Sequence, residues 1–551
     1  MDEDPAYTMP EAAMTAAFER LEEAETALVD MVLWLQSTCI SSLAPGTNFQ
    51  RASVALNLLL GLDAAISSRT DLPEALEGAF TGTFEPLFLS FESRYPEVRE
   101  LGLAMAQSYA WRRDVAAHQM LAVHAVNQGL ALCQRARSRE ADAGAVFLAF
   151  AADYHRRQSL WLAQGVHVDH DGDGQWEAVD ASDGRELLAV VLELVQGQLV
   201  AAEHDCVASS KDQPLHGLIL ALDRLLAGNT TQERLELSLE LATRAVAVGL
   251  RLLTARLDDT AAIPDFAEMD MAVTNRLDES SATIASADHS YLSSFAWTVL
   301  RNSCLVLSTG ARMALGQGSP TTLRVEAVSE IYTTLTKTML SCRHRGVIES
   351  FAAALSAFAH AVTSSKQEAL CVLPSRWLEQ QLDQLADLDA WRQLSVTRRS
   401  AGLPYIIHSL VNEEAAKIRK KRVKLAATKL LAIAATPIAT HADVTKDPPQ
   451  VSCSVFKQTL PNRPVLQMHA LHVLEALVRE SALAKDIEPF LESCLLAAIA
   501  GFDSDLWVVR SACMRLFSNT MQRVSGVYST HTSSSRIDTA TFADRYSKAS
   551  L

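Results

Sequence analysis

The chain has 551 residues, of which 49% are hydrophobic and 6% aromatic, and its formal net charge is −16. This length exceeds what one compact core usually holds, except in repeat architectures whose core grows along one axis. The acidic balance would repel nucleic acid, so an RNA-binding role would require a local basic patch.

Cysteine usage and the N-terminal sequence bear on the compartment. The nine cysteines are scattered and form no CxxC pair, which favours reduced, buried thiols in a cytosolic or nuclear protein over a disulfide or zinc framework. The N-terminal segment MDEDPAYTMP is acidic and lacks the apolar region of a signal peptide. The most apolar stretch, residues 425–439, contains Lys429 and Pro437, so we expect a cytoplasmic protein without membrane insertion.

Predicted helices follow one another along the chain. Apolar residues recur at helical spacing in segment after segment, and strand patterns are nearly absent. A chain of this length built from helical hairpins predicts an all-α fold, an α-solenoid of HEAT- or armadillo-like repeats. In chain order, we predict helices over residues 11–40, 51–66, 98–110, 114–135, 143–163, 185–204, 214–227, 231–257, 290–313, 321–340, 344–362, 403–435, 464–484, 487–500 and 506–525.

Two segments support the repeat architecture: YPEVRELGLAMAQSYA (95–110) and DSDLWVVRSACMRLFSN (503–519). In each, an acidic or Pro-containing turn leads into Val-Arg on the first helical turn, and apolar residues follow. The pattern resembles the second helix of a HEAT-type repeat, in which an arginine near the helix start bonds into the preceding turn. Longer breaks lie at 164–184, 258–289 and 441–463, and the Ser/Thr-rich residues 526–551 predict a disordered tail.

The segment DHDGDGQWEAVD (169–180) matches the calcium-loop template in spacing. The ligand-type residues at loop positions 1, 3, 5, 9 and 12 are Asp169, Asp171, Asp173, Glu177 and Asp180. Position 12 is usually a bidentate Glu, and the shorter Asp reaches an ion less well. Because no second loop is found, an acidic, Gly-rich turn between two helices is the alternative interpretation.

Other catalytic and metal patterns are weak. His469 and His472 lie three residues apart and can share a helix face, but no HExxH pattern is completed, and packed helix histidines are the commoner explanation. The sequence contains no GxSxG, no GxxxxGK[ST] and no GxGxxG after a strand. We therefore predict a non-catalytic chain without a cofactor.

Positive charge concentrates between residues 391 and 430. This stretch holds ten Lys or Arg residues and only two acids, Glu413 and Glu414, so it carries about +8 while the rest of the chain carries about −24. Such a concentration on an acidic scaffold indicates a place for phosphates. A solvated helix face balanced by acidic neighbours in the fold explains it equally well.

Two basic corners precede apolar helices. Arg398 and Arg399 run into Gly402 and Pro404, and guanidinium groups bind phosphate or carboxylate bidentately. Gly402 permits close backbone approach, and we expect Pro404 to start the next helix. The segment CRHRGVIESF repeats the theme, with Arg343 and Arg345 before Gly346.

Six segments stand out along the chain: SSFAWTVLRNSCLVLSTG (293–310), RHRGVIESF (343–351), LPSRWL (373–378), SVTRRSAGLPYII (395–407), QMHALHVLEALVRESAL (467–483) and GFDSDLWVVRSACMRLFSNTMQR (501–523). In this order they resemble the conserved central domain of the thyroid adenoma-associated protein family. The heptapeptide 398–404 is the most distinctive, and the resemblance covers roughly residues 210–525, whereas residues 1–200 match only as a generic helical-repeat scaffold.

The resemblance implies a helical-repeat adaptor without a methyltransferase site of its own. Its implied partners are a catalytic tRNA 2′-O-methyltransferase subunit and tRNA, and the adaptor would direct methylation to ribose 32 of the anticodon loop. A protein–protein scaffold without an RNA role is the alternative. By carry-over from the family, the RNA- or partner-binding residues are Arg398, Arg399, Ser400, Ala401, Gly402, Leu403 and Pro404, followed by the corner of Arg343, His344, Arg345 and Gly346.

Overall fold

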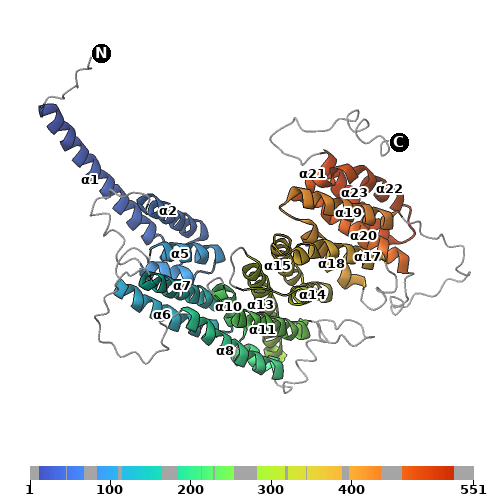
Figure 1. Ribbon diagram of the computed structural model, residues 1–551, viewed down its shortest axis with the longest axis horizontal. Coiled ribbons are helices and arrows are strands. Elements are labelled where there is room, and N and C mark those ends of the chain that lie inside the picture. Colours follow the sequence, from blue (N-terminus) through green and yellow to red (C-terminus); the bar gives the residue numbers. More distant parts are fainter. Residues whose placement is uncertain are drawn as a thin grey trace, which may run out of the picture. The chain divides into compact units, whose positions relative to one another are not determined.

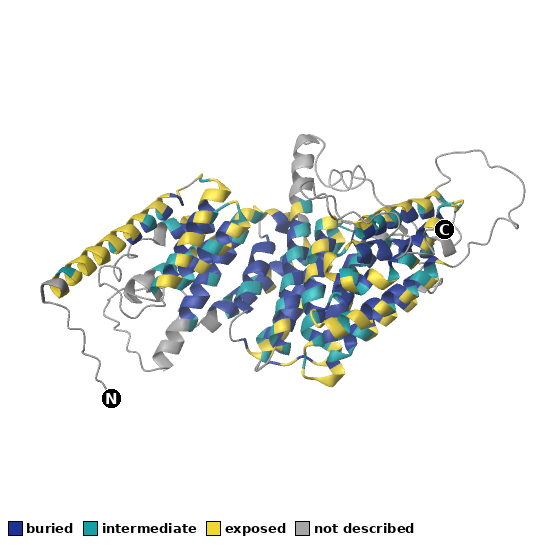
Figure 2. Cartoon of the chain, turned by 90° about the horizontal axis from the view of Figure 1, so that it is seen from above, coloured by how far each residue is buried: buried dark blue, intermediate teal, exposed yellow. Residues whose placement is uncertain are grey.

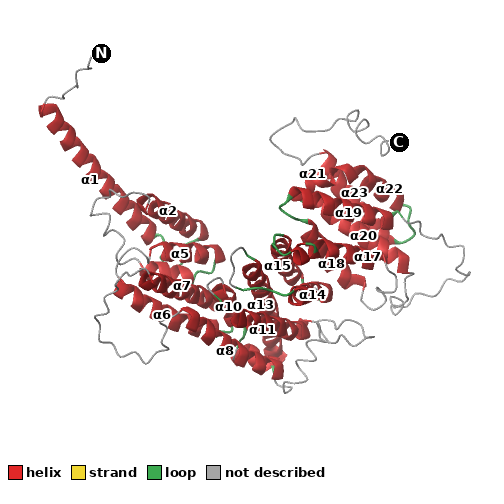
Figure 3. Ribbon diagram, viewed as in Figure 1, coloured by secondary structure: helices red, strands yellow, loops and turns green. Residues whose placement is uncertain are grey.

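The computed structural model consists of helices and connecting turns, and no strand occurs in the residues that it describes (Figures 1 and 3). The all-α prediction is therefore confirmed. The described residues are 11–44, 46–67, 84–109, 115–163, 184–212, 214–226, 230–253, 282–316, 321–342, 344–386, 396–435 and 462–525. The Asp-rich loop 169–180 and the Ser/Thr-rich tail lie outside them.

The chain divides into two compact units, each with its own set of packed helices. Unit 1 contains residues 1–198 and 208–229, and unit 2 contains residues 199–207 and 230–551. The helices that lie in unit 1 or cross its boundary are α1 (Glu11–Ser41), α2 (Phe49–Ser67), α4 (Phe84–Phe91), α5 (Pro96–Tyr109), α6 (Val115–Cys133), α7 (Ser138–Ala163), α8 (Gly184–His204), α9 (Cys206–Asp212) and α10 (His216–Leu226). The helices α6 and α7 pack closely because Gly144 lacks a Cβ atom, which would lie 2.5 Å from the backbone nitrogen of Cys133.

Unit 2 alternates between two layers of helices. The A layer contains α11 (Gln232–Leu253), α14 (Val325–Ser341), α17 (Leu373–Ala386), α19 (Ala416–Ala434) and α22 (Leu491–Gly501). The B layer contains α13 (Ala282–Leu315), α15 (Arg345–Thr363), α18 (Val396–Val411), α20 (Asn462–Arg479) and α23 (Trp507–Ser525). Each A helix packs against the B helix that follows it, and each B helix packs against the next B helix. This alternation is the arrangement expected of stacked helical hairpins.

Short helical turns complete the connections of unit 2. They are α16 (Glu368–Cys371), η2 (Ser481–Leu483), α21 (Ala484–Ile487) and η3 (Glu488–Phe490). Figure 2 shows buried residues along the lines where neighbouring helices meet and exposed residues on their outer sides.

An arginine near the start of three helices bonds into the preceding turn, as the HEAT-like pattern predicts. Arg99 donates to the carbonyl oxygen of Ser93 at 2.8 Å, and Arg510 donates to that of Ser504 at 2.6 Å. Arg419 makes the same bond without the Val-Arg pattern before it, since it donates to the carbonyl oxygen of Glu413 at 3.1 Å. In each case the acceptor lies six residues earlier. These bonds satisfy turn carbonyls that would otherwise lack a donor.

Several predicted boundaries were wrong. The predicted run 403–435 is two helices, because Glu413 in the turn between α18 and α19 is buried and binds His360 at 2.6 Å. Pro404 does not start a helix: α18 begins at Val396 and continues through it. The proline lacks the backbone N–H that would donate a hydrogen bond within α18.

Other differences concern whole elements. The helices α4 and α17 were not predicted, and α13 begins at Ala282, inside the predicted break 258–289. Two windows, Leu187–His204 and Arg345–Thr363, are long and apolar enough to cross a membrane, but 44% and 50% of them are buried within the protein. Packed core helices meet the same criterion, so the absence of membrane insertion stays a prediction.

Candidate functional site

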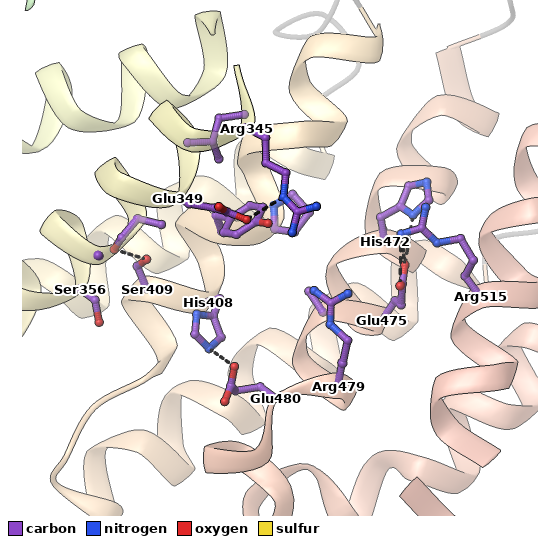
Figure 4. A pocket seen from close by; sticks show the side chains of 16 residues that line it. Arg345, Glu349, Ser356, His408, Ser409, His472, Glu475, Arg479, Glu480 and Arg515 are labelled. Carbon is purple, nitrogen blue, oxygen red and sulfur yellow. Dashed lines mark hydrogen bonds and ion pairs between the residues drawn. The ribbon is translucent and has the colours of Figure 1, made fainter. Parts of the chain in front are cut away.

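A groove of about 840 Å³ opens on the B layer of unit 2. Its walls are α15, α18, α20 and α23, with Glu480 just beyond the end of α20 (Figure 4). On α15 the lining positions 345, 348, 349, 352 and 356 recur three to four residues apart, so they form one face of the helix.

The groove is hollow because its lining includes short side chains. Ala352 and Ala353 on α15 and Ala476 on α20 all line the groove, and their short side chains do not fill the space. Ser409 ties two walls together, since its Oγ donates to the carbonyl oxygen of Ala352 at 3.0 Å. Tyr405 adds an aromatic ring to the lining.

A buried carboxylate holds one side of the groove in place. The side chain of Glu475 is only 6% exposed, and its carboxylate accepts from Arg515 Nη2 at 3.0 Å and from Asn519 Nδ2 at 3.1 Å. His472 Nδ1 lies 3.5 Å from the same carboxylate. Burial alone would raise the pKa of Glu475, but His472 and Arg515 together lower it more. Glu475 is therefore ionised and its charge is neutralised within the protein.

A second acid–histidine pair links α18 to the end of α20. His408 Nε2 lies 3.2 Å from Glu480 Oε2, and Glu480 also caps η2 by accepting from the backbone nitrogen of Ala482 at 3.3 Å. Burial lowers the pKa of His408, and Glu480 offsets this effect only in part. His408 is therefore neutral at pH 7.

Three arginines present N–H groups to the groove. The side chain of Arg345 is 85% exposed and uses its Nε to bind Glu349 at 2.7 Å. Arg515 is 58% exposed and uses Nη2 for Glu475. Arg479 is exposed and has no ion-pair partner among the described residues. Figure 4 shows Arg345 and Arg479 extending their guanidinium groups into the space between the walls. Their remaining donors can bind an anionic ligand.

The corner at the start of α15 has a structural part and an exposed part. His344 caps the helix, since its Nδ1 accepts from the backbone nitrogen of Val347 at 3.4 Å. Gly346 makes room for Trp297 on α13, whose Nε1 would lie 2.9 Å from a Cβ atom at this position. Arg345 is the member that reaches the groove. Arg343 lies outside the described residues.

The heptapeptide 398–404 lies within α18. The side chains of Arg398, Arg399, Ser400 and Ala401 are outside the described residues. The close backbone approach expected at Gly402 is confirmed, because a Cβ atom there would collide with the carbonyl group of Met339 on α14. Leu403 is buried, and Pro404 lines the groove.

The basic residues of α19 divide into two sets. Arg422 is 3% exposed and binds Glu413, Ser375 and Thr363. Arg419 pairs with Asp486 at 2.7 Å, and Lys429 pairs with Asp383. The remaining side chains are exposed, have no ion-pair partner among the described residues and recur at helical spacing along one face; we call this set the lysine face. Its members are Lys417, Lys420, Lys421 and Lys424.

No group of three potential metal ligands occurs among the described residues. His469 is 1% exposed and packs in the core, whereas His472 faces the groove, so the two histidines are not brought together as ligands. The calcium-loop residues Asp169 to Asp180 lie outside the described ranges.

Comparisons with known proteins agree with the resemblance drawn from the sequence. The family model described as "THADA/TRM732, DUF2428" matches residues 235–508. The mouse protein named tRNA (32-2'-O)-methyltransferase regulator THADA is 30% identical over 42% of this chain and 11% of its own length. The Schizosaccharomyces pombe regulator trm732 is 21% identical over 89% of this chain and 30% of its own length. The chain thus spans less than a third of either relative.

Among solved structures, the karyopherin Kap121p bound to the extreme C-terminus of the phosphatase Cdc14p aligns with 94% of this chain and 50% of its own length. The TM-score is 0.30 and the identity is 11%, so this similarity supports no inference about function.

Proposed function

Because residues 235–508 belong to the DUF2428 family of THADA/TRM732 proteins, we propose that the chain acts as a non-catalytic regulator of a tRNA 2′-O-methyltransferase. The family match carries the proposal, since the matched segment contains the whole heptapeptide and every residue that lines the groove except Arg515. The names of the mouse and S. pombe relatives support it, because both are regulators of tRNA (32-2'-O) methylation.

In this proposal the chain is an adaptor. It binds the catalytic subunit, which carries the methyl-donor chemistry, and it directs methylation to ribose 32 of the tRNA anticodon loop. Holding that ribose near the active site of the partner lowers the entropic part of the barrier. Recognition of tRNA would depend on its shape and phosphates more than on base edges in the helical stems.

The heptapeptide supplies the first test. The double variant Arg398→Ala/Arg399→Ala, combined with the catalytic subunit and tRNA, is expected to lose 2′-O-methylation at nucleotide 32 while its far-ultraviolet circular dichroism stays unchanged. A matched control is Lys337→Ala/Arg376→Ala, which removes two exposed positive charges from the A-layer helices α14 and α17. Wild-type methylation by the heptapeptide variant would reject a role for the arginine pair.

The alternative, a protein–protein scaffold without an RNA role, draws support from one observation. The helix α1 in unit 1 exposes large apolar side chains, with Phe18, Leu21 and Trp34 each more than 60% exposed, as protein interfaces do. Salt dependence separates the two functions: an RNA adaptor binds tRNA at low salt with its catalytic partner present, and its affinity falls as salt rises. Absence of tRNA binding under these conditions would favour the scaffold.

A further inference from the structure

We propose that the groove on the B layer binds a single-stranded segment of RNA, with its phosphates on Arg345, Arg479 and Arg515. The inference rests on the proposed function and assigns the RNA loop to a particular surface. It does not involve Arg398 or Arg399, so the two can be tested independently.

The charged side chains of the groove differ in how far they are available to a ligand. The groove contains three arginines and three glutamates, so their formal charges balance. Each glutamate, however, already has a partner within the protein. Glu475 is buried and contacts Arg515, Asn519 and His472. Glu480 binds His408 and caps η2, and Glu349 pairs with Arg345. All three guanidinium groups are exposed, and each retains N–H donors that bind no acceptor among the described residues.

The groove extends across four neighbouring helices. The arginines come from α15, α20 and α23, and α18 lies between the first two. Packed helices lie about 8–10 Å apart, so a row across four helices extends over about 24–30 Å. Such a row suits a chain of phosphates better than a single carboxylate or one phosphate group.

Small apolar side chains and rings complete the lining of the groove. The lining combines small apolar side chains, Ala352 and Ala476, with the ring of Tyr405 and the imidazoles of His408 and His472. Single-stranded RNA is recognised by stacking of unpaired bases on aromatic and guanidinium planes together with cationic contacts to the backbone. A paired stem offers no base faces to these groups, whereas the loop of a tRNA does.

The test measures RNA binding directly. We would compare an anticodon stem-loop oligoribonucleotide with the same stem in fully paired form, by fluorescence anisotropy over a range of salt concentrations. The variant Arg345→Gln/Arg479→Gln removes two phosphate donors without leaving a buried charge unpaired. It is expected to weaken stem-loop binding by about tenfold or more and to reduce the log–log salt slope by roughly 1.4, while binding of the paired stem changes little.

The matched control is Lys337→Gln/Arg376→Gln on the A layer, which changes the net charge equally and should leave stem-loop binding at the wild-type level. Equal weakening by both variants would overturn the inference, because it would show an effect of net charge alone. Unchanged stem-loop binding by the groove variant would also overturn it. If the groove variant binds the stem-loop normally but no longer captures the catalytic subunit, the groove is a protein-binding site.

The same samples keep the two proposals apart. Capture of the catalytic subunit and methylation of nucleotide 32 are measured with wild-type protein in parallel. If wild-type protein supports both but the groove variant binds the stem-loop normally, only the groove assignment fails. If wild-type protein supports neither, the proposed function fails.

Discussion

The groove of the B layer and the helix α19 of the A layer both carry many positive charges, but they use them differently. On α19 the basic residues are neighbours in sequence, and Arg419, Arg422 and Lys429 bind acids of the same unit. In the groove the arginines are up to 170 residues apart in sequence, and their guanidinium groups remain accessible. A dense run of positive charge is thus partly structural, whereas sparse arginines converge on one surface. The comparison shows that charge density along a sequence is a poor guide to where accessible guanidinium groups gather in the fold.

The largest effect is expected for the basic residues of α19 that bind acids of the same unit. Arg422→Ala removes a buried guanidinium that binds Glu413 and donates to the carbonyl oxygen of Leu410 at 3.0 Å. Because Glu413 is itself buried, the substitution leaves a poorly compensated charge and should lower the free energy of unfolding by about 3–5 kcal/mol. Urea denaturation would measure this loss. The neighbouring Lys421→Ala is the control and should change stability by less than about 0.5 kcal/mol; similar losses in both variants would remove the distinction within α19.

The next largest effect is expected at Glu475, the buried carboxylate that holds one side of the groove in place. Glu475→Gln keeps the shape of the side chain but removes the charge that binds His472 and Arg515, and it should cost about 1–3 kcal/mol at pH 7. The folded-state pKa of Glu475 lies below its ordinary value of 4.5, so the stabilisation is present above pH 4.5 and is lost as the pH falls through the folded-state pKa.

Denaturation of wild type and Glu475→Gln at several pH values checks this sign. The stability difference should shrink as the pH falls below 4.5. The exposed ion pair provides the comparison, since Glu349→Gln should cost no more than about 0.5 kcal/mol. A difference that does not shrink below pH 4.5 would contradict a lowered folded-state pKa for Glu475.

The smallest effect on folding is expected for the lysine face. Replacing its four lysines by glutamine should leave the unfolding free energy within about 1 kcal/mol of wild type, because no described residue pairs with them. If the lysine face binds paired RNA, the salt slope for the paired stem should fall by up to about 0.9 for each phosphate that is no longer neutralised. The preference for stem-loop over paired stem should increase. Weakening of stem-loop binding as large as that of the groove variant would break the contrast between the two surfaces.

Much of the fold was predictable because helical periodicity is a local property. The order and type of most helices follow from apolar spacing. The arginine bond into the turn at Arg99 and Arg510 follows from the Val-Arg pattern after an acidic or Pro-containing turn. The separation of α18 from α19 was not predictable, since the apolar pattern continues across the turn. It depends on a bond from His360, which lies 53 residues before Glu413.

The groove could be predicted only in part. Arg345 was identified by its place in a basic corner, whereas Arg479 and Arg515 look like ordinary exposed arginines in amphipathic helices. The alanines at 352, 353 and 476 look like any good helix former. Only the packing of four B helices turns these residues into a hollow surface, and that packing joins segments more than 100 residues apart.

The continuity of α18 has a mechanical consequence. The heptapeptide occupies its first half, and Tyr405, His408 and Ser409 on its second half form a wall of the groove. One continuous helix therefore contains both segments, and its backbone contacts α14 near its middle, at Gly402. A molecule bound at the first half of α18 and an occupant of the groove would therefore contact the same rigid helix.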